Sequence, residues 1–480
     1  MDHADPRRWW ALAALALGVL TVGLDSTIVN VALPTLSHEL HASTSQLQWI
    51  ANAFNLVFAA ALLPAGLLGD RFGRKKLLLG ALALFGIASL ACALASNAGQ
   101  LIAARALLGL GGAALMPLSM AVLPVLFSDR DRPKAISTWV AATAIALPLG
   151  PILGGVLLDN FAWGSIFLVN VPVVLAALVA IALLVPESRS ARAPRIDVTG
   201  IVLSSAALGL LTYGAIEAGD RGWGDALVLG TLAAGAALLA VFAATQLRLE
   251  RRPDGEPLIE LALLRSPTYL WATVLATIVS FALFGLLFVA PQFFAIVFGA
   301  DALGTGLRLL PVIGGLVVGS RVSGRLLTQL GAKRVIAAGF VLMTAGLALG
   351  ATSSVESGYG VTAAWIALVG VGTGFALPTA MDAAMSQLTA DSAGVGSALV
   401  QTCRQVGGTI GVALLGTVLA ARYAGPGDSA AAFVDGMDAL LWVAAAVAAA
   451  GIVLALALMP SARAGAAPVE EAQSEHGIAV

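Results

Sequence analysis

The chain has 480 residues, of which 59% are hydrophobic and only 11% are charged, and its mean hydropathy is +0.93. Soluble domains carry roughly 25% charged residues, so this chain has too few to cover a surface that faces water. Its net charge of −1 gives no electrostatic basis for binding nucleic acid. Composition therefore predicts an all-α polytopic membrane protein, because helices satisfy their own backbone hydrogen bonds in lipid.

Apolar stretches of about 20 residues, the length that crosses a bilayer, occur fourteen times along the chain. The first is too long for a secretory signal and lacks a cleavage site, so we expect it to be a spanning helix. The predicted spans are 9–32, 47–68, 77–96, 100–122, 135–158, 165–185, 198–217, 226–247, 268–290, 306–324, 334–352, 360–381, 395–420 and 437–459.

The basic residues predict how these spans are oriented. With the N-terminus inside, 21 of the 26 Lys and Arg residues fall in segments that face the cytoplasm. Only Arg221 and Arg422 fall in outward segments. Cytoplasmic loops carry an excess of Lys and Arg, so we expect both termini in the cytoplasm and an even number of helices.

A charged segment flanked by glycines lies between the second and third spans and returns far downstream. Its first copy runs from Gly66 to Lys76 (GLLGDRFGRKK), and its second runs from Gly324 to Arg334 (GRLLTQLGAKR). In both copies two glycines stand seven residues apart, and a basic pair follows the second glycine. Internal repeats commonly build membrane transporters, so this duplication predicts a transporter with two related halves.

A second repeat, in the fourth and twelfth spans, shows how the halves correspond. Residues 109–117 (GLGGAALMP) match residues 370–378 (GVGTGFALP) at an offset of 261 residues, against 258 for the first repeat. Spans seven and eight fall outside this correspondence, and we expect them to be peripheral. The predicted units are an N-terminal six-helix half (1–190), an inserted helix pair with its connectors (191–265), a C-terminal six-helix half (266–460) and a disordered cytoplasmic tail (461–480).

Asp25 is an acidic residue inside the first span, within the run LDSTIVNVALP that begins at Leu24. A carboxylate at membrane depth costs roughly 2.5–3.5 kcal/mol on insertion scales, and such residues usually serve a function. Asp25 is therefore a candidate proton carrier, and the alternative is a solvated carboxyl group near the outer interface. Ser26 and Asn30 stand four residues apart on an adjoining face, which indicates the wall of a polar cavity.

Other polar residues inside spans are candidates for the same pathway. Arg105 lies in the fourth span, where its repeat counterpart is Ile366, so the fold itself does not require this charge. A buried guanidinium needs a partner, which Asp25 can supply; the alternative is that Arg105 reaches the outer interface. Asn52 and Asn55 in the second span could bind a ligand or join helices.

Two further patterns indicate how the protein moves. A proline and three glycines in the fifth span would remove a backbone hydrogen bond and allow close helix packing, although a simple kink is the alternative: Gly150, Pro151, Gly154 and Gly155. In the charged loop, Asp70 could be a solvated surface acid. The flanking glycines and cations instead predict a turn that directs its carboxylate at a helix N-terminus or an Arg. The candidate gating residues are Gly66, Asp70, Arg71, Gly73, Arg74 and Lys75.

Taken together, these patterns resemble the major facilitator superfamily, and within it the fourteen-helix drug:proton antiporter family, over nearly the whole chain. The Gly66–Lys76 segment is similar to the superfamily's signature between helices two and three. The stretch around Arg105 is similar to the fourth-helix signature, whose Arg is linked to proton transfer. Residues 150–155 are similar to the fifth-helix antiporter signature, and residues 25–34 to the first-helix pattern of the fourteen-helix branch. The resemblance implies a major facilitator fold, with two six-helix halves and an inserted helix pair.

The chain departs from that family at three places. Residues 163–165 read Trp-Gly-Ser where the family often shows Trp-Arg-Trp. The second copy of the charged segment has Thr328 and Gln329 in place of Asp70 and Arg71, so a gating role is expected only for the first copy. No clear acid stands in the middle of span ten, where relatives that export dications carry one, so a dicationic substrate is less favoured.

We therefore expect a proton-coupled antiporter that exports amphipathic small molecules, such as drugs, dyes and antibiotics, across the cell membrane by alternating access. Asp25 and Arg105 would couple proton entry to this export. The expected partners are the substrate, protons and the lipid bilayer, with no nucleic acid, cofactor or metal; a periplasmic adaptor stays an open question. The alternatives are a facilitator-type transporter of one specific metabolite and, more remotely, a membrane receptor. A membrane-embedded enzyme is disfavoured, because no histidine lies within a span to build a zinc or nucleophile site. Direct use of ATP is not expected, because no phosphate-binding Gly-x-x-x-x-Gly-Lys-Ser/Thr loop occurs.

Overall fold

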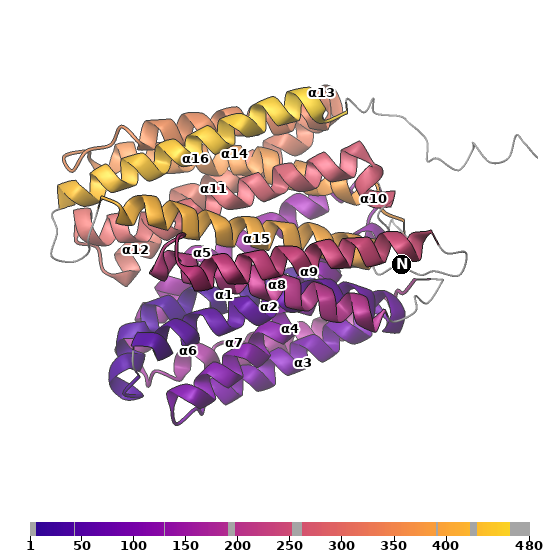
Figure 1. Cartoon of the computed structure of the whole chain (residues 1–480), viewed down its shortest axis with the longest axis horizontal. Coiled ribbons are helices and arrows are strands. Elements are labelled where there is room, and N and C mark those ends of the chain that lie inside the picture. Colours follow the sequence, from indigo (N-terminus) through magenta and orange to yellow (C-terminus); the bar gives the residue numbers. More distant parts are fainter. Residues whose placement is uncertain are drawn as a thin grey trace, which may run out of the picture.

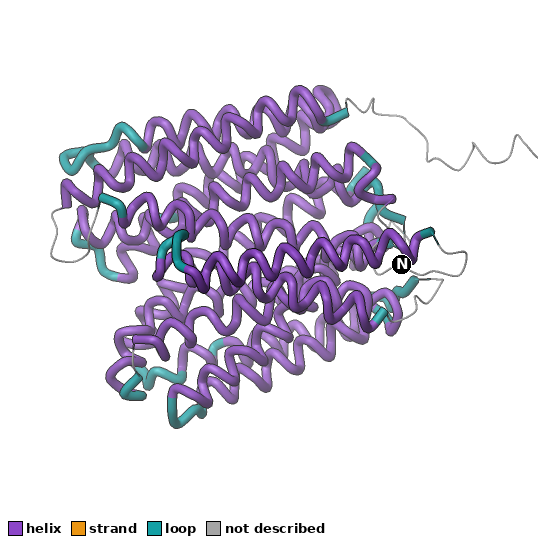
Figure 2. Tube along the Cα trace, viewed as in Figure 1, coloured by secondary structure: helices purple, strands orange, loops and turns teal. Residues whose placement is uncertain are grey.

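A computed structural model describes residues 6–42, 44–128, 130–190, 197–251, 262–389, 392–422 and 430–460. Within these ranges the chain is helical and contains no strand, and short turns join its helices (Figure 2). The helices are α1 (Arg7–Glu39), α2 (Thr44–Phe72), α3 (Arg74–Ala93), α4 (Ala98–Leu126), α5 (Arg132–Asn160), α6 (Ser165–Leu168), α7 (Asn170–Leu184), α8 (Val198–Arg221), α9 (Ala226–Glu250), α10 (Ala262–Arg265), α11 (Pro267–Phe298), α12 (Ala302–Arg308), α13 (Leu310–Gly350), α14 (Tyr359–Met385), α15 (Ala393–Ala420) and α16 (Ala430–Leu458).

The predicted fourteen spans correspond to these helices. Eleven helices of the described chain are long and apolar enough to cross a membrane, with α13 counted once. α13 contains two predicted spans, because Gly331 interrupts its helical backbone with φ 76° and ψ 160°. α5 and α15, at 29 and 28 residues, have the length of the remaining two spans. The protein is therefore an all-helical membrane protein with about fourteen spanning helices, as predicted.

The long helices run roughly side by side and form two groups (Figure 1). In this view the N-terminal helices lie in the lower part and the C-terminal helices in the upper part, with α8 and α9 in front of both. α8 packs against α2 and α15, which belong to different groups, and α9 packs against α8. We expected both inserted helices to be peripheral; α8 instead bridges the two groups. The predicted disordered tail, 461–480, lies outside the described residues.

The two copies of the charged segment form the same backbone turn. Gly73 separates α2 from α3 with φ 107°, and Gly331 breaks α13 with φ 76°. Side chains rarely adopt such positive φ values, whereas glycine does so readily. The spacing of seven residues, shared by the two copies, thus places a glycine at each turn. Both copies need a glycine there because it adopts the positive φ that the turn requires.

The second repeat also has the same role in both halves, which is close helix packing. A Cβ atom on Gly109 of α4 would lie 2.5 Å from the backbone oxygen of Phe54 in α2. A Cβ atom on its counterpart, Gly370 of α14, would come still closer to the backbone oxygen of Val312 in α13. Small residues let helix backbones approach one another in a membrane, so these glycines hold equivalent helix pairs together in the two halves.

Candidate functional site

Asp25 and Arg105 form an ion pair inside the N-terminal half. Nη1 of Arg105, on α4, donates to Oδ2 of Asp25, on α1, and Nε donates to the backbone oxygen of Ile50 at 2.9 Å. The two side chains are 0% and 1% exposed. Asp25 is therefore not a solvated carboxylate, and Arg105 does not extend to the membrane surface. A buried pair of this kind is held together by geometry, since each charge would be costly to leave alone.

The surroundings of this pair leave one carboxylate oxygen able to accept a proton. Oδ1 of Asp25 is buried and has no hydrogen-bond partner among the described residues. The Arg105 guanidinium lies 5.2 Å from the centroid of the Phe54 ring, which favours the cation through the ring's π electrons. Asn170 of α7 lies beside the carboxylate, and its Nδ2 donates to Ser89 Oγ at 3.4 Å.

Sequence reasoning missed Asn170 as a member of this cluster. Its signal was an uncharged amide within an otherwise apolar run, the predicted span 165–185. The cluster around Asp25 and Arg105 therefore draws on α2, α3, α4 and α7 as well as α1. The cluster can bind one proton, and neutralising Asp25 would release Arg105 from its ion pair.

The polar residues predicted to line a cavity are partly accessible, and the structure does not join them into one network. Ser26 Oγ donates to the backbone oxygen of Gly23 at 2.8 Å. Asn52 and Asn55 are half-buried on α2 and make no side-chain hydrogen bond within the described part of the chain. Asn30 belongs to α1, but its side chain lies outside what the structure describes. The two α2 amides are therefore free of interhelical hydrogen bonds and available to a ligand.

Asp70 is not exposed at a loop; it is 1% exposed near the end of α2. Its carboxylate accepts two hydrogen bonds from Arg74, from Nε at 3.0 Å and from Nη2 at 2.7 Å. It also accepts the backbone N–H groups of Gly394 at 3.1 Å and Val395 at 3.0 Å. These N–H groups begin α15, where the helix dipole favours an anion. The expected contact with a helix N-terminus and an Arg therefore exists, and it joins the two halves.

The predicted gating loop is helical except at Gly73, because α2 continues through Asp70 and Arg71 to Phe72. Gly66 allows α2 to meet α15, since a Cβ there would lie 2.6 Å from the backbone oxygen of Gly394. Lys75 Nζ donates to the backbone oxygen of Ala182 at 2.7 Å, within the N-terminal half. Arg71 lies 5.7 Å from the centroid of the adjacent Phe72 ring. Gly66, Asp70 and Arg74 thus form the contact between the halves. Lys75 bonds the start of α3 to the end of α7 within the N-terminal half.

Other contacts also join the halves, at the helix ends that the basic residues predict to face the cytoplasm. Arg132, which begins α5, donates from Nε to Oδ1 of Asp382 on α14 at 3.0 Å. Ser397 Oγ of α15 donates to the backbone oxygen of Pro117 in α4 at 3.0 Å. The sequence showed charges at these helix ends but not their partners. Together with the Asp70 contact, these interactions hold the two halves together at this end of the interface.

The fifth-span pattern packs α5 against α1 beside Asp25. A Cβ on Gly150 would overlap Thr27 Oγ1, and one on Gly154 would lie 3.0 Å from Cγ1 of Ile28. Gly155 is half-buried, and the helix continues through Pro151 without interruption. The glycines bring α5 into direct contact with the helix that carries the candidate proton carrier.

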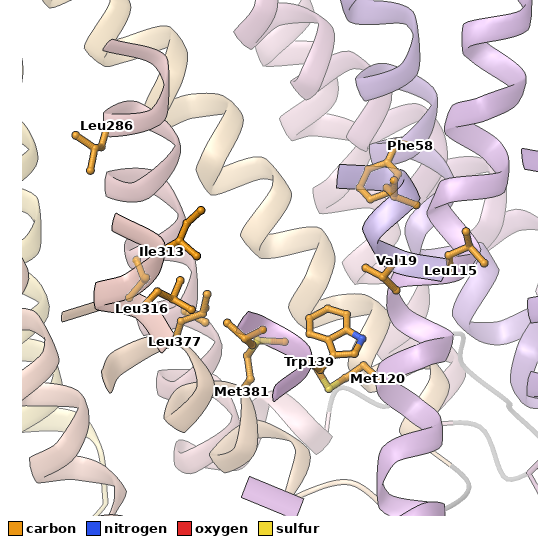
Figure 3. Close-up of a cluster of buried hydrophobic side chains, with 14 of the residues drawn as sticks. Val19, Phe58, Leu115, Met120, Trp139, Leu286, Ile313, Leu316, Leu377 and Met381 are labelled. Atoms are coloured by element: carbon orange, nitrogen blue, oxygen red, sulfur yellow. The ribbon is translucent and has the colours of Figure 1, made fainter. Parts of the chain in front are cut away.

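Apolar side chains from both halves belong to one buried cluster. Figure 3 shows Val19, Phe58, Met120 and Trp139 from the N-terminal helices together with Leu377 and Met381 of α14. All six side chains are buried. Methionine and aromatic side chains adapt to ligands of varied shape. Within the described part of the chain, no three His, Cys, Asp or Glu side chains lie together in a way that could hold a metal ion.

The helical architecture and the duplicated halves are those of a membrane transporter. The family profile described as Major Facilitator Superfamily matches residues 15–412. The chain belongs to this superfamily, whose members are transporters and not enzymes.

Curated relatives from several bacteria resemble the chain over most of its length. It is 39% identical to the tetracenomycin C resistance and export protein of Streptomyces glaucescens, over 87% of this chain and 77% of that protein. It is 33% identical to the puromycin resistance protein pur8 of Streptomyces alboniger, over 90% and 86%. The methyl viologen resistance protein SmvA of Salmonella typhimurium is also 33% identical, over 87% and 83%. The chain is therefore related to drug-resistance and export proteins of the fourteen-helix group.

Two solved structures share the fold. The human organic anion transporter MFSD10 (TETRAN) matches with a TM-score of 0.65, at 15% identity, over 94% of this chain and 100% of that one. A double-tryptophan mutant of XylE matches with a TM-score of 0.68, also at 15% identity, over 95% and 97%. At this identity the matches show the fold alone.

Proposed function

We propose that the protein is a proton-coupled antiporter that exports amphipathic small molecules across the cytoplasmic membrane. The observation that carries this proposal is the buried pair of Asp25 and Arg105, in which one carboxylate oxygen lacks a partner among the described residues. Intramembrane acids of this kind commonly carry protons in transporters. The relatives that are resistance and export proteins support the direction of transport.

In this mechanism a proton enters from outside and neutralises Asp25 at Oδ1. Arg105 lies seven residues after the start of α4 and bonds Ile50 near the start of α2. Under the orientation given by the basic residues, these helix ends face outward. The closed inner contacts at Asp70 and Asp382 separate the pair from the cytoplasm. Loss of the Asp25 charge frees Arg105, changes the packing of α1 against α4 and allows the halves to rock inward.

The substrate binds between the halves in this proposal. The apolar lining of Figure 3 suits an aromatic or otherwise amphipathic compound, and Asn52 and Asn55 can fix its polar groups. A transporter of one specific metabolite is the second candidate function. It would be favoured by saturable transport of a single compound with no inhibition by unrelated amphipathic dyes.

The test is transport by the purified full-length protein in liposomes with an imposed pH gradient. A fluorescent dye such as ethidium or rhodamine 123 serves as the test substrate. It should move in the direction opposite to the proton flow, and this transport should stop when an ionophore collapses the pH gradient. Asp25→Asn protein, reconstituted at the same density, is the matched control and should not respond to the gradient. Dye movement that ignores the gradient in the wild-type protein would refute proton coupling.

A further inference from the structure

A second arginine lies within the membrane-spanning part of the protein, in the C-terminal half. Arg404 of α15 stands eleven residues after the first residue of that helix, or about 16 Å along it at 1.5 Å per residue. That depth is well inside a hydrocarbon core about 30 Å thick. The Arg404 residue is half-buried.

Arg404 differs from Arg105 because it has no carboxylate partner among the described residues. Nε donates to Ser280 Oγ of α11 at 3.2 Å, and Nη1 donates to Gln401 Oε1 at 2.6 Å. Nη1 also contacts Met381 Sδ of α14 at 3.6 Å. All three acceptors are neutral, and thioether sulfur is a weak one. A cation held at this depth by neutral groups alone is costly, so the fold by itself gives no reason for the charge.

The adjoining Gln401 supplies an independent observation at the same place. This side chain is only 6% exposed, and its Nε2 is buried with no hydrogen-bond partner in the described chain. Its Oε1 is used by Arg404, so the amide turns its N–H groups away from the guanidinium. Buried donors without partners are rare. Gln401 and Arg404 therefore present a set of N–H donors and no competing acceptor.

These donors belong to the face of α15 that meets the N-terminal half. Ser397, Gln401 and Arg404 are spaced by four and three residues, which places them on one face of the helix. Ser397 bonds the backbone oxygen of Pro117 in α4, across the interface. Met381, which contacts Arg404, belongs to the buried apolar cluster that both halves form (Figure 3). The donor set thus adjoins this apolar cluster.

We propose that Arg404 and Gln401 form a subsite for an anionic oxygen of the substrate, such as a phenolate, an enolate or a carboxylate on an aromatic ring system. The proposal rests on the proposed function, because it assigns a substrate class to the same interior. Charged oxygen acceptors form short, strong hydrogen bonds with guanidinium groups. The apolar cluster of Figure 3 would contact the ring system of the substrate. The substrate anion would supply the negative charge that no described residue provides to Arg404.

The test compares two dyes that share a xanthene scaffold, fluorescein as the anion and rhodamine 123 as the cation. Binding is measured by fluorescence polarisation on purified full-length protein in detergent, at mildly alkaline pH and with no proton gradient. The wild-type protein should bind fluorescein about tenfold more tightly than rhodamine 123. Arg404→Gln should weaken fluorescein binding by about tenfold and leave rhodamine 123 within about twofold.

Two further variants separate recognition from stability. Arg404→Lys keeps the charge and should retain an intermediate affinity for fluorescein, because a point charge replaces the planar donor set. Arg325→Gln removes an exposed cation from the second repeat copy and should change neither dye. An equal loss of both dyes in Arg404→Gln, or a wild-type protein that fails to prefer fluorescein, would overturn the proposal. The binding measurement uses no proton gradient, so it tests the anion subsite separately from proton-driven export. A preference for fluorescein without proton-driven export would refute only the proposed function. Proton-driven export without that preference would refute only the subsite.

Discussion

Arg132, the first residue of α5, donates from Nε to Oδ1 of Asp382 on α14 at 3.0 Å, and the two residues stand 250 positions apart in the chain. Both side chains are 13% exposed, so the pair is largely removed from water. Like the bond between Ser397 and Pro117, it joins the two halves at the end predicted to face the cytoplasm. We expect this ion pair, together with Asp70, to hold that side of the interface closed.

Neutralising the pair should shift the protein toward the state that is open to the cytoplasm. A pair at this depth is worth about 1 kcal/mol, which corresponds to about a fivefold change in the ratio of the two states. We expect Asp382→Asn to raise the labelling rate of Ser397→Cys from the inner side by about this factor. The charge exchange Arg132→Asp with Asp382→Arg should restore the slow rate. Unchanged labelling in Asp382→Asn would show that the pair does not hold the gate.

The two repeat copies provide a matched pair of glycine substitutions. A Cβ at Gly66 would collide with the backbone oxygen of Gly394 at 2.6 Å, whereas one at Gly324 meets nothing within 4 Å. Gly66→Ala should therefore push α2 away from α15, weaken the bonds to Asp70 and reduce transport severalfold. Gly324→Ala should leave transport and melting temperature unchanged, since alanine also favours the helix. The prediction is tested by dye efflux at equal expression, and it fails if both variants behave alike.

This contrast also shows what a single sequence can and cannot provide. The spacing of Gly66 and Gly73 predicted the turn and its repetition at Gly331, because backbone conformation is encoded locally. The partners of Asp70 were not predictable in the same way. They are backbone N–H groups of Gly394 and Val395, which any residue could supply.

The candidate proton site was predictable for a related reason. A lone acid and a lone base in apolar spans each need a partner, so Asp25 and Arg105 could be paired from the sequence alone. Asn170 could not be added, because an uncharged amide in a span has several acceptable surroundings. Arg404 likewise stood out as a charge within a span, but the neutral character of its neighbours became visible only in three dimensions.

Of the two inserted helices, we expect α8 to contribute to the stability of the fold and α9 to contribute little to transport. Leu208 of α8 is buried in a cluster with Leu63 and Leu67 of α2 and Val395 of α15. By contrast, Leu229 and Val241 of α9 are 54% and 49% exposed. We expect Leu229→Ala and Val241→Ala to keep efflux within about a factor of two, and Leu208→Ala to lower the melting temperature. Loss of efflux in the α9 variants at normal expression would place that helix in the pathway.

The orientation of the chain can be tested with two exposed positions on opposite sides of the predicted membrane. Ser96 lies between α3 and α4, and Arg189 lies between α7 and α8. With Cys92 and Cys403 replaced, Ser96→Cys should react with an impermeant maleimide added outside intact cells. Arg189→Cys should react only in inverted vesicles, because basic loops stay in the cytoplasm. Labelling of both positions from one side would refute the orientation and the odd number of spans, namely the fourth, fifth and sixth, predicted between them.

The decisive variant concerns Asp25, whose ion pair with Arg105 carries the proposed coupling. Asp25→Asn resembles the permanently protonated side chain, so it cannot release a proton to the cytoplasm. We expect gradient-driven efflux to stop, while exchange of substrate across the membrane without net proton movement persists. Binding of dye to detergent-purified protein should stay within about twofold of the wild type, because the variant leaves the apolar lining intact.

Asp25→Glu and Arg105→Gln complete this test, because they separate the carboxyl group from its ion pair. Asp25→Glu keeps a carboxyl group but moves it by one methylene, so partial efflux with a shifted pH optimum is expected. Arg105→Gln leaves the buried carboxylate without its partner, at a cost of about 3–5 kcal/mol, and should therefore lower the melting temperature. The double variant Asp25→Asn/Arg105→Gln removes both charges, so it should regain part of the lost melting temperature. Vesicles loaded with dye and given a pH jump measure efflux in each variant at matched protein density. Normal gradient-driven efflux by Asp25→Asn would show that a polar group alone suffices there, and the proton carrier would then have to be sought at Asp382, the acid that faces Arg132 at the inner gate.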